Sequence, residues 1–381
     1  MMALKDSQKT MYDHSEVKVR LLKLYLERYL NVINSLSYID AIHLYDMFCG
    51  EGVYENGGLG SPLQMLEIIK NIHFQNRANG KSKSINCHFN DIEEWKTKKV
   101  ETEISNRKLH YKEMGGLTFS NQDYRVLVAK VALDITNLKN EKAFIFIDPY
   151  GYKEIRISDI KNLLAGKNSE VLLFLPTQFM FRFEEKGTPE SLKEFISEIL
   201  PKEQWPKSDT GIEFIDNLMD GFQMALGEDF FVDRFIITRD KNQFFCLFYF
   251  TSHIYGFDRM QDAKWEIDEE EGRGWQFEGE SNLFNTVEKT ANTFIFERKL
   301  KEFLSNPRTN SDVYKFTLHQ RHKPSHCNEI LMKLQNENCL EVLNKDGSKG
   351  RKSAFYINYS SYKNTPDKII IKVRSNGTII N

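Results

Sequence analysis

The apolar residues of this chain fall into short runs that alternate with longer stretches of helical period. Mainly apolar runs of strand length occupy 41–47, 85–90, 117–122, 142–147 and 171–175. Apolar residues spaced three or four apart predict helices over 17–34, 62–72, 93–105, 124–138 and 158–164. Strands that are apolar through their length and alternate with helices are typical of a parallel sheet covered on both faces.

The pattern changes after the fifth of these strands. Residues 184–228 carry a helical period and predict a helical insertion. The apolar runs 231–239 and 243–251 are separated only by a short turn, which predicts two further strands in a hairpin. Residues 262–274 are charged and contain glycines, so they indicate an exposed linker. We therefore predict an α/β domain over residues 1–285.

A different arrangement is predicted for residues 286–381. Amphipathic helices are expected at 293–305, 311–319 and 324–336, followed by a hairpin with strands at 340–343 and 353–357. Three helices followed by a hairpin is the order of a winged helix. The second domain is therefore predicted to be a winged-helix domain with a basic tail.

Composition limits the class of protein. Of the 381 residues, 40% are hydrophobic and 28% are charged, as in soluble globular proteins. No uncharged apolar run approaches the roughly 18 residues that span a bilayer, and the polar N-terminus does not resemble a signal peptide. The five cysteines are scattered and form no CxxC pair, which fits a reducing compartment. We therefore expect a cytoplasmic protein that does not contact a membrane.

The net charge of −2 conceals an uneven distribution. Residues 291–381 carry 16 Lys and Arg against 8 Asp and Glu, so their charge is +8 and that of the remaining chain is −10. A basic module predicts a polyanionic partner, here nucleic acid and most simply DNA. The alternatives are a tail that only aids solubility and a winged helix that binds protein. The cations expected to meet phosphates precede the third helix or lie at the hairpin turn: Arg321, Lys323, Lys349, Arg351 and Lys352.

The segment Asp46-Met47-Phe48-Cys49-Gly50-Glu51-Gly52 follows the first predicted strand and leads into a helix. Its glycines let the backbone pass close to a ligand, and Ser61-Pro62 is a good helix start. A third glycine in register and a Gly-Lys-Ser/Thr sequence are both missing, which disfavours a dinucleotide fingerprint and a P-loop. The segment resembles motif I of class I S-adenosylmethionine (SAM) methyltransferases. The alternative is an ordinary strand-turn-helix.

Acidic residues follow each of the first four predicted strands: Asp46, Asp91, Asp123 and Asp148. The carboxyl ends of parallel strands meet at one edge of a sheet, where ligands of open α/β folds bind. A single such Asp is more often a turn residue or a helix cap. Four of them in register predict a shared binding site.

A SAM site in this sheet makes three demands on these residues. The glycine loop would lie against the methionine part, where Asp46 would accept a hydrogen bond from the ammonium group or from a water. Asp91 would bind the ribose hydroxyls, and Asp123, or Gln122 in its place, would bind the adenine amine. The predicted cofactor-binding residues are Asp46, Phe48, Gly50, Gly52, Asp91 and Asp123.

The fourth strand ends at Asp148-Pro149-Tyr150-Gly151. Enzymes that methylate exocyclic base amines carry an acid or amide followed by Pro-Pro-Tyr or Pro-Pro-Phe at this point. The acid and a carbonyl next to proline orient the amine, and the aromatic ring stacks on the flipped base. Here Tyr replaces the second Pro, and no Pro-Cys dipeptide supports a cysteine nucleophile. We predict Asp148, Pro149 and Tyr150 as catalytic residues; the alternative is a strand-ending turn.

Together these motifs resemble the three-Cys-motif partner (TcmP) proteins, a prokaryotic and phage family. The matching segments are 46–54, Gly60-Ser61-Pro62-Leu63, Phe89-Asn90-Asp91 and Ile147-Asp148-Pro149-Tyr150-Gly151, with Cys49 in place of the usual Ala. The resemblance implies a class I methyltransferase-like fold over roughly residues 17–180. It also implies a radical-SAM-like partner protein that carries the three cysteines, and a setting in nucleic-acid modification, repair or phage conflict.

The predicted fold is thus an α/β, Rossmann-like class I methyltransferase sheet, mostly parallel with an antiparallel hairpin, followed by a winged helix. The predicted function is SAM-dependent modification of nucleic acid, at a base amine. The alternative is a catalytically inactive adaptor of the same fold that binds nucleic acid and recruits a partner enzyme. A Mg²⁺-dependent nuclease ranks last, because the acids lie one to a strand and each has a role in SAM binding. No His or Cys pattern indicates a metal site.

Overall fold

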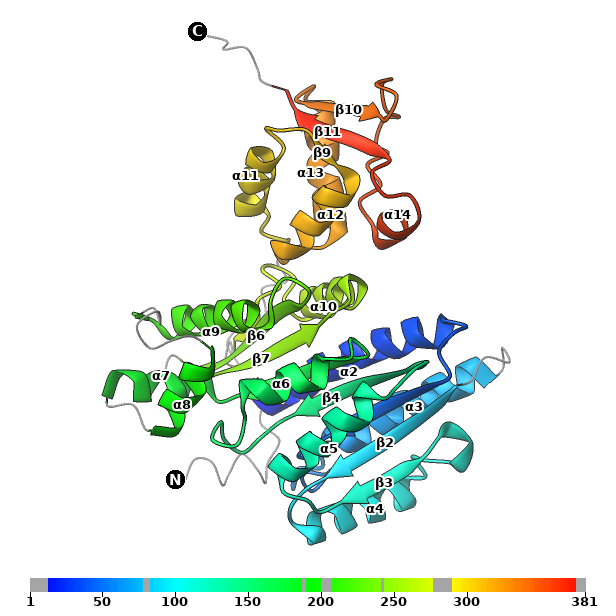
Figure 1. The fold of residues 1–381 in the computed structure, drawn as a ribbon, viewed down its shortest axis with the longest axis vertical. Helices are drawn as coiled ribbons and strands as arrows, with labels where there is room; N and C mark the ends of the chain where they lie inside the picture. The colour runs from blue at the N-terminus through cyan, green and yellow to red at the C-terminus, as the bar shows by residue number, and fades with distance from the viewer. Residues whose placement is uncertain are drawn as a thin grey trace, which may run out of the picture. The chain divides into compact units, whose positions relative to one another are not determined.

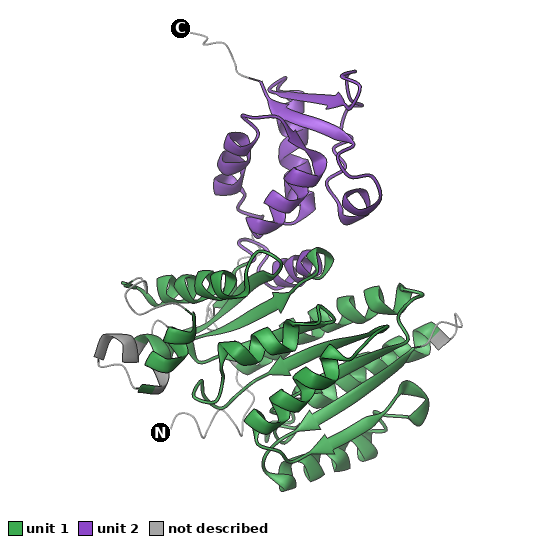
Figure 2. Cartoon of the chain, in the orientation of Figure 1, with its two compact units in different colours: residues 1–256, 273–283 green, residues 257–272, 284–381 purple. Residues whose placement is uncertain are grey.

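The computed structural model describes residues 13–77, 83–186, 190–199, 207–240, 243–276 and 290–374 (Figure 1). The chain divides into two compact units (Figure 2). Unit 1 comprises Met1–Gly256 and Arg273–Leu283, and unit 2 comprises Phe257–Gly272 and Phe284–Asn381. The boundary expected after residue 285 lies close to the last junction. Phe257–Gly272, however, belongs to unit 2, although the sequence had placed it in the first domain.

Unit 1 is built on an eight-stranded sheet with the order β3-β2-β1-β4-β5-β7-β6-β8 (Figure 1). The strands are β1 (Ala41–Asp46), β2 (Ser84–Asn90), β3 (Leu117–Ser120), β4 (Glu141–Ile147), β5 (Ser169–Leu175), β6 (Phe231–Asp240), β7 (Gln243–Thr251) and β8 (Gly274–Gln276). The first five run parallel, and β7 is antiparallel to β5 and β6. A parallel sheet that closes with an antiparallel hairpin is the class I methyltransferase form, so the predicted fold class is confirmed.

Helices cover both faces of this sheet (Figure 1). On one face lie α2 (Asp13–Ser35), α3 (Ser61–Arg77) and α4 (Glu94–Arg107). On the other face α5 (Tyr124–Thr136), α6 (Ile157–Leu164), α8 (Glu190–Ile199) and α9 (Gly211–Leu226) share one core with the strands. The described parts of the predicted insertion over 184–228 are therefore mainly helical, but the first helix, α7 (Thr177–Lys186), begins directly after β5.

Successive side chains of the central strands point to opposite faces of the sheet, and each face is covered by its own core. In β4, the Phe144 ring packs against Tyr25 and Tyr29 of α2, with centroids 5.8 and 5.7 Å apart. Its neighbours Ala143 and Ile145 lie in the core formed with α5 and α6. Because both faces of the strand are buried, its sequence is apolar throughout, and this is the pattern from which the parallel strands were predicted.

The segment 262–274, predicted to be a solvated surface segment or linker, is only partly exposed: Glu266, Glu269, Glu270 and Arg273 are exposed. Its first part belongs to α10 (Ile254–Ile267). Trp265 is only 3% exposed, and its ring contacts those of His322 and His326 within unit 2, at 5.2 and 4.3 Å. Burial of one large aromatic ring therefore outweighs the charge of the surrounding residues.

Unit 2 contains the three predicted helices and a three-stranded sheet in the order β10-β11-β9 (Figure 2). Its elements are α11 (Phe294–Phe303), β9 (Arg308–Thr309), α12 (Asn310–His319), α13 (Pro324–Asn336), β10 (Leu340–Asn344), α14 (Tyr359–Asn364) and β11 (Ile369–Val373).

The strand predicted over 353–357 is wrong. Ser353 and Tyr356 have φ angles of 60° and 57°, which interrupt an extended backbone. β10 pairs instead with β11, in antiparallel register. Phe355 and Ile357 are buried, as their alternation suggested, but by side-chain packing and not in a strand ladder.

Within the parts of the chain that the structure describes, no helix is both long enough and apolar enough to cross a membrane. The cysteines expected in the core, Cys49, Cys87 and Cys246, are buried.

Candidate functional site

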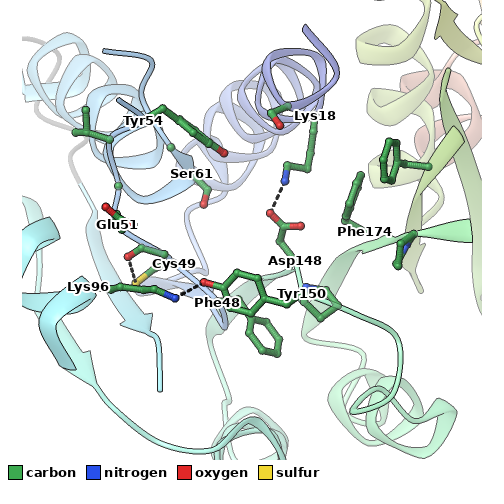
Figure 3. Close-up of a pocket in the computed structure, with 18 of the residues that line it drawn as sticks. Lys18, Phe48, Cys49, Glu51, Tyr54, Ser61, Lys96, Asp148, Tyr150 and Phe174 are labelled. Carbon is green, nitrogen blue, oxygen red and sulfur yellow. Dashed lines mark hydrogen bonds and ion pairs between the residues drawn. The ribbon is translucent and has the colours of Figure 1, made fainter. Parts of the chain in front are cut away.

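A cavity of about 280 Å³ opens at the carboxyl edge of the parallel strands in unit 1 (Figure 3). Its walls come from the loops after β1 and β4, the start of α7 after β5, and the ends of β6 and β7 that face the same edge. Helices α2 and α4 each contribute a lysine. The cavity therefore crosses the point where the strand order reverses, between β1 and β4, which is where ligands of open α/β sheets bind.

The loop after β1 needs glycine at two positions for different reasons. Gly50 has a φ of 59°, and a Cβ there would meet no atom within 4 Å, so its backbone faces open space. Gly52 has a φ of 74°, and a Cβ there would lie 3.0 Å from Val100 Cγ2. The Cys49 N–H donates to the Asn90 carbonyl at 2.8 Å, which fixes the loop to the end of β2. The loop thus presents bare backbone, as a nucleotide-type cradle requires.

Asp46 lies behind this loop and does not line the cavity. Its carboxyl group is fully buried and accepts the Phe48 N–H at 3.3 Å. Burial, with a smaller contribution from Asp148, raises the pKa of Asp46 to about 7 against the lowering effect of the Ser61 hydroxyl. Among the described residues, Oδ2 has no hydrogen bond of ordinary geometry. The structure shows Asp46 supporting the loop from behind, and its contact with a cofactor stays a prediction.

Asp91 is also buried behind the cavity wall, at 1% exposure, and two wall residues hold its carboxylate. The Tyr150 hydroxyl donates to Oδ2 at 3.3 Å, and Lys96 Nζ lies 3.6 Å from Oδ1. Lys96 also donates to the Tyr150 hydroxyl at 2.6 Å (Figure 3). The carboxylate predicted to bind a ribose is therefore covered by Lys96 and Tyr150.

The proton positions in this chain of contacts follow from burial and charge. Burial raises the pKa of the Tyr150 hydroxyl well above its usual value, so the group stays protonated and donates. Burial alone would lower the pKa of Lys96, but hydrogen bonds to Glu93 and Tyr150 outweigh it, and the net pKa is raised. The ammonium group of Lys96 and the carboxylate of Asp91 therefore lie close together as opposite charges.

Asp123 takes no part in the cavity wall. Its exposed carboxylate caps α5 by accepting the Arg125 N–H at 2.9 Å, because β3 ends earlier than predicted and the chain turns before it. A role in adenine binding stays a prediction. The sequence analysis missed Asn90, whose Nδ2 donates to the carbonyls of Met47 and Gln122 at 3.2 and 3.0 Å and so ties three strand ends together.

Asp148 lines the cavity, as predicted for a residue that meets substrate, and it pairs with Lys18 of α2 (Figure 3). Their side chains are 20% and 9% exposed. Burial alone would lower the pKa of Lys18, but the Asp148 carboxylate outweighs it, so the net pKa is raised and Lys18 stays protonated. The sequence gave no signal for Lys18, because its partner lies 130 residues away.

Phe48, Pro149 and Tyr150 also line the cavity. The Phe48 ring stacks on Tyr124 at 5.2 Å and meets Tyr150 edge-on at 6.5 Å. Tyr150 is 45% exposed, and Lys96 Nζ lies 4.6 Å from its ring centroid. Of the predicted residues, the structure thus places the glycine loop, Phe48 and the loop from Asp148 to Tyr150 around one cavity.

The cavity continues past Asp148 on the side away from the glycine loop, where Phe174 lies in Figure 3. Phe174 stacks on Phe245 with centroids 5.5 Å apart and planes inclined by 20°. Gln178, Gln243 and Arg239 add polar groups to this part of the wall. The sequence analysis missed all of them, since they follow strands without forming a recognisable motif.

The predicted nucleic-acid contacts of unit 2 flank α13 at its two ends. Lys349, Arg351 and Lys352 are exposed on the segment between β10 and α14, which touches the end of α13 through the Ser353 N–H and Gln335 Oε1 at 2.8 Å. The other two cations, Arg321 and Lys323, directly precede α13 and are half-buried. The five cations therefore do not form one cluster, and their contact with nucleic acid stays a prediction.

Comparisons with known proteins found only distant similarities. No protein-family model matches the chain, and no curated protein matches its sequence. A Legionella pneumophila protein of the DUF519 family model is 13% identical, with 66% of this chain and 90% of that chain covered and a TM-score of 0.39. An O-methyltransferase from Bacillus cereus solved with SAH is 11% identical, at 65% and 86% coverage and a TM-score of 0.35. The methyltransferase domain of bacterial CtHen1-C is 10% identical, at 61% and 98% coverage and a TM-score of 0.29.

These similarities are too weak to support an activity. The class therefore rests on the strand order of unit 1 and on the cavity at the reversal of that order, which define a class I methyltransferase-like domain. No family model or curated protein supports the resemblance to three-Cys-motif partner proteins. The resemblance is therefore used only as part of a proposal.

Proposed function

We propose that unit 1 binds SAM against the glycine loop and transfers its methyl group to an exocyclic amine of a nucleic-acid base. The observation that carries this proposal is the single cavity that joins the bare backbone of Gly50 to the carboxylate of Asp148. A donor site and an acceptor-orienting group on one cavity wall is what proximity catalysis requires.

The residues fit the two ends of the cofactor unequally. The open space at Gly50, beside Ser61 and Tyr54 on the same wall, suits the methionine part. The adenosine part fits the predicted position only when Asp91 exchanges its contacts with Lys96 and Tyr150 for the ribose hydroxyls. Lys96 and Tyr150 both border the cavity, so a ligand can reach them without a change in the sheet.

Bound SAM would supply an electrophilic methyl carbon on a sulfonium. The Asp148 carboxylate and the Pro149 carbonyl would accept hydrogen bonds from the acceptor amine and so aim its lone pair at that carbon. The carboxylate would also receive the proton that the amine loses after transfer. Lys18 holds its own proton and so is no general base; its ion pair with Asp148 holds that side chain in place.

Unit 2 would supply the grip on nucleic acid through the basic segment between β10 and α14. We infer a winged helix here from the order of its helices and strands. A cytoplasmic location, a preference for DNA, and a radical-SAM-like partner protein in a modification, repair or phage-conflict setting complete the proposal. The last of these rests on the resemblance of the sequence motifs alone.

A second candidate is an adaptor that keeps the fold without the chemistry. It is favoured by the fact that Asp91 and Asp148 are each already paired with a lysine. An adaptor of this kind would recruit a partner enzyme to nucleic acid.

Transfer of a labelled methyl group from SAM to DNA and RNA separates the two candidates. A methyltransferase labels nucleic acid, and Asp148→Ala abolishes the label while nucleic-acid binding persists. An adaptor gives no label with either protein, and Asp148→Ala leaves its cellular function intact.

A further inference from the structure

The half of the cavity beyond Asp148 has the composition of a pocket for a flat ring. It lies over β5, β6 and β7, on the far side of the strand reversal from β2 and β3. The stacked rings of Phe174 and Phe245 form one wall. An apolar aromatic surface of this kind can stack on the face of another aromatic ring. Such stacking does not discriminate between bases, because every base has a flat face.

Gln178 is the polar group of this half that has no internal role. It lies in the first turn of α7, which the Thr177 hydroxyl anchors to the Phe244 carbonyl of β7 at 3.5 Å. Gln178 is 3% exposed and lines the cavity. Among the described residues, its side-chain amide has no hydrogen-bond partner. The amide is not among the buried side-chain atoms left without a partner, so it is open to the cavity, where it can bond a ligand that enters.

We propose that Gln178 and the Phe174–Phe245 wall hold the acceptor base, with the Gln178 amide N–H donating to a ring nitrogen beside the amine that Asp148 orients. This inference rests on the proposed function and specifies its substrate. The base would be one that has an accepting ring nitrogen beside its exocyclic amine, which is N1 in adenine and N3 in cytosine or guanine. It would enter unstacked, from a single strand or by flipping.

The methyl transfer from SAM to the amine needs no co-reactant beyond those proposed above. The amine nitrogen forms the bond to the methyl carbon, the carbon–sulfur bond breaks with its electrons on sulfur, and the amine proton leaves to Asp148. Gln178 exchanges no proton. It is a specificity residue that selects which base places its amine in reach.

The test uses the full chain, single-stranded DNA with one 2-aminopurine, and three variants. Gln178→Leu keeps the size of the side chain and removes the amide, while Gln178→Glu leaves only acceptors. Gln64→Leu is the control, because it makes the same substitution at a glutamine outside the cavity wall, whose Oε1 is buried without a partner among the described residues. Anisotropy measures affinity for the strand, 2-aminopurine emission reports entry of the base, and calorimetry measures SAM binding.

We expect wild type and Gln64→Leu to change the emission on binding. Both Gln178 variants should bind the strand and SAM as wild type does, lose most of the emission change, and show a kcat for methylation of DNA or RNA lowered at least tenfold. Unchanged emission and base preference in Gln178→Leu would overturn the inference, as would a wild type that binds the strand without any change in emission. Absence of SAM binding in all four proteins would instead refute the proposed function, because the emission arm does not depend on SAM.

Discussion

The ammonium group of Lys18 and the carboxylate of Asp148 form a direct ion pair, with Nζ 2.5 Å from Oδ2. It joins the first described helix to the loop after β4, and it places a fixed positive charge beside the residue assigned to orient the acceptor. Lys18 Nζ also lies 4.6 Å from the Phe174 centroid, so the same lysine borders the glycine-loop half and the aromatic half of the cavity.

Breaking this pair from either side should have unequal effects. Asp148→Asn leaves the buried ammonium of Lys18 without its counter-ion, and we expect the free energy of unfolding to fall by about 1–3 kcal/mol. Lys18→Met should cost less, because the carboxylate that remains is partly exposed. Urea unfolding of both single variants and the double variant gives the coupling energy. Additive effects would contradict a functional ion pair.

The glycine loop gives a prediction with an internal control. Gly50→Ala and Gly57→Ala both place a side chain on a backbone with positive φ, 59° and 83°, in open space. Both should cost about 1 kcal/mol of stability. Only Gly50 lines the cavity, so only Gly50→Ala should weaken SAM binding, at least tenfold. Equal SAM affinities in the two variants would remove the loop from the cofactor site.

The contacts that cover Asp91 predict that removing the hydroxyl oxygen of Tyr150 increases the affinity for SAM. Tyr150→Phe deletes the hydroxyl that bonds Asp91 and Lys96, so the ribose hydroxyls would no longer compete with it. We expect SAM to bind several-fold more tightly, in line with about 1 kcal/mol for one hydrogen bond. Calorimetry of wild type and variant measures this. Weaker binding would instead mean that the hydroxyl itself contacts the cofactor.

The buried carboxyl of Asp46 predicts a pH dependence of stability. Burial raises its pKa to about 7 from an ordinary value of 3.8, so the folded protein retains a proton that the unfolded chain releases. Stability relative to Asp46→Asn should therefore fall as pH rises from about 4 to about 7, by up to roughly 4 kcal/mol, and then level off. Urea unfolding at several pH values decides this. Parallel profiles for the two proteins would show that Asp46 is ionised throughout.

The cations of unit 2 predict a change in salt dependence. If Lys349, Arg351 and Lys352 meet phosphates, their triple Ala variant should reduce the slope of log K against log salt for duplex DNA by about 2–3. Arg298→Ala with Lys299→Ala, on α11, is the control and should change the slope less. A triple variant with the wild-type slope would place the nucleic-acid surface elsewhere.

The sequence predicted the parallel strands because each is buried on both faces and therefore apolar throughout, as Phe144 and Ile145 illustrate. It failed at Ser353 and Tyr356, since a left-handed backbone leaves no mark on an alternating pattern. It also misjudged the first part of 262–274, where Ala263, Lys264 and Trp265 are buried.

At the site, local motifs predicted the glycine loop and the segment from Asp148 to Tyr150. They could not predict which acids face the cavity. Lys18 and Lys96 reach Asp148 and Asp91 from other helices, and such partners follow from tertiary packing alone. Gln178 was missed for the same reason, since its place on the cavity wall follows from tertiary packing.

Equilibrium binding of labelled SAM to the intact chain tests the central claim most directly. We predict saturable binding of one SAM per chain, weakened at least tenfold in Gly50→Ala and retained in Gly57→Ala. No saturable binding by the wild-type chain, either alone or with single-stranded DNA or RNA present, would contradict the account.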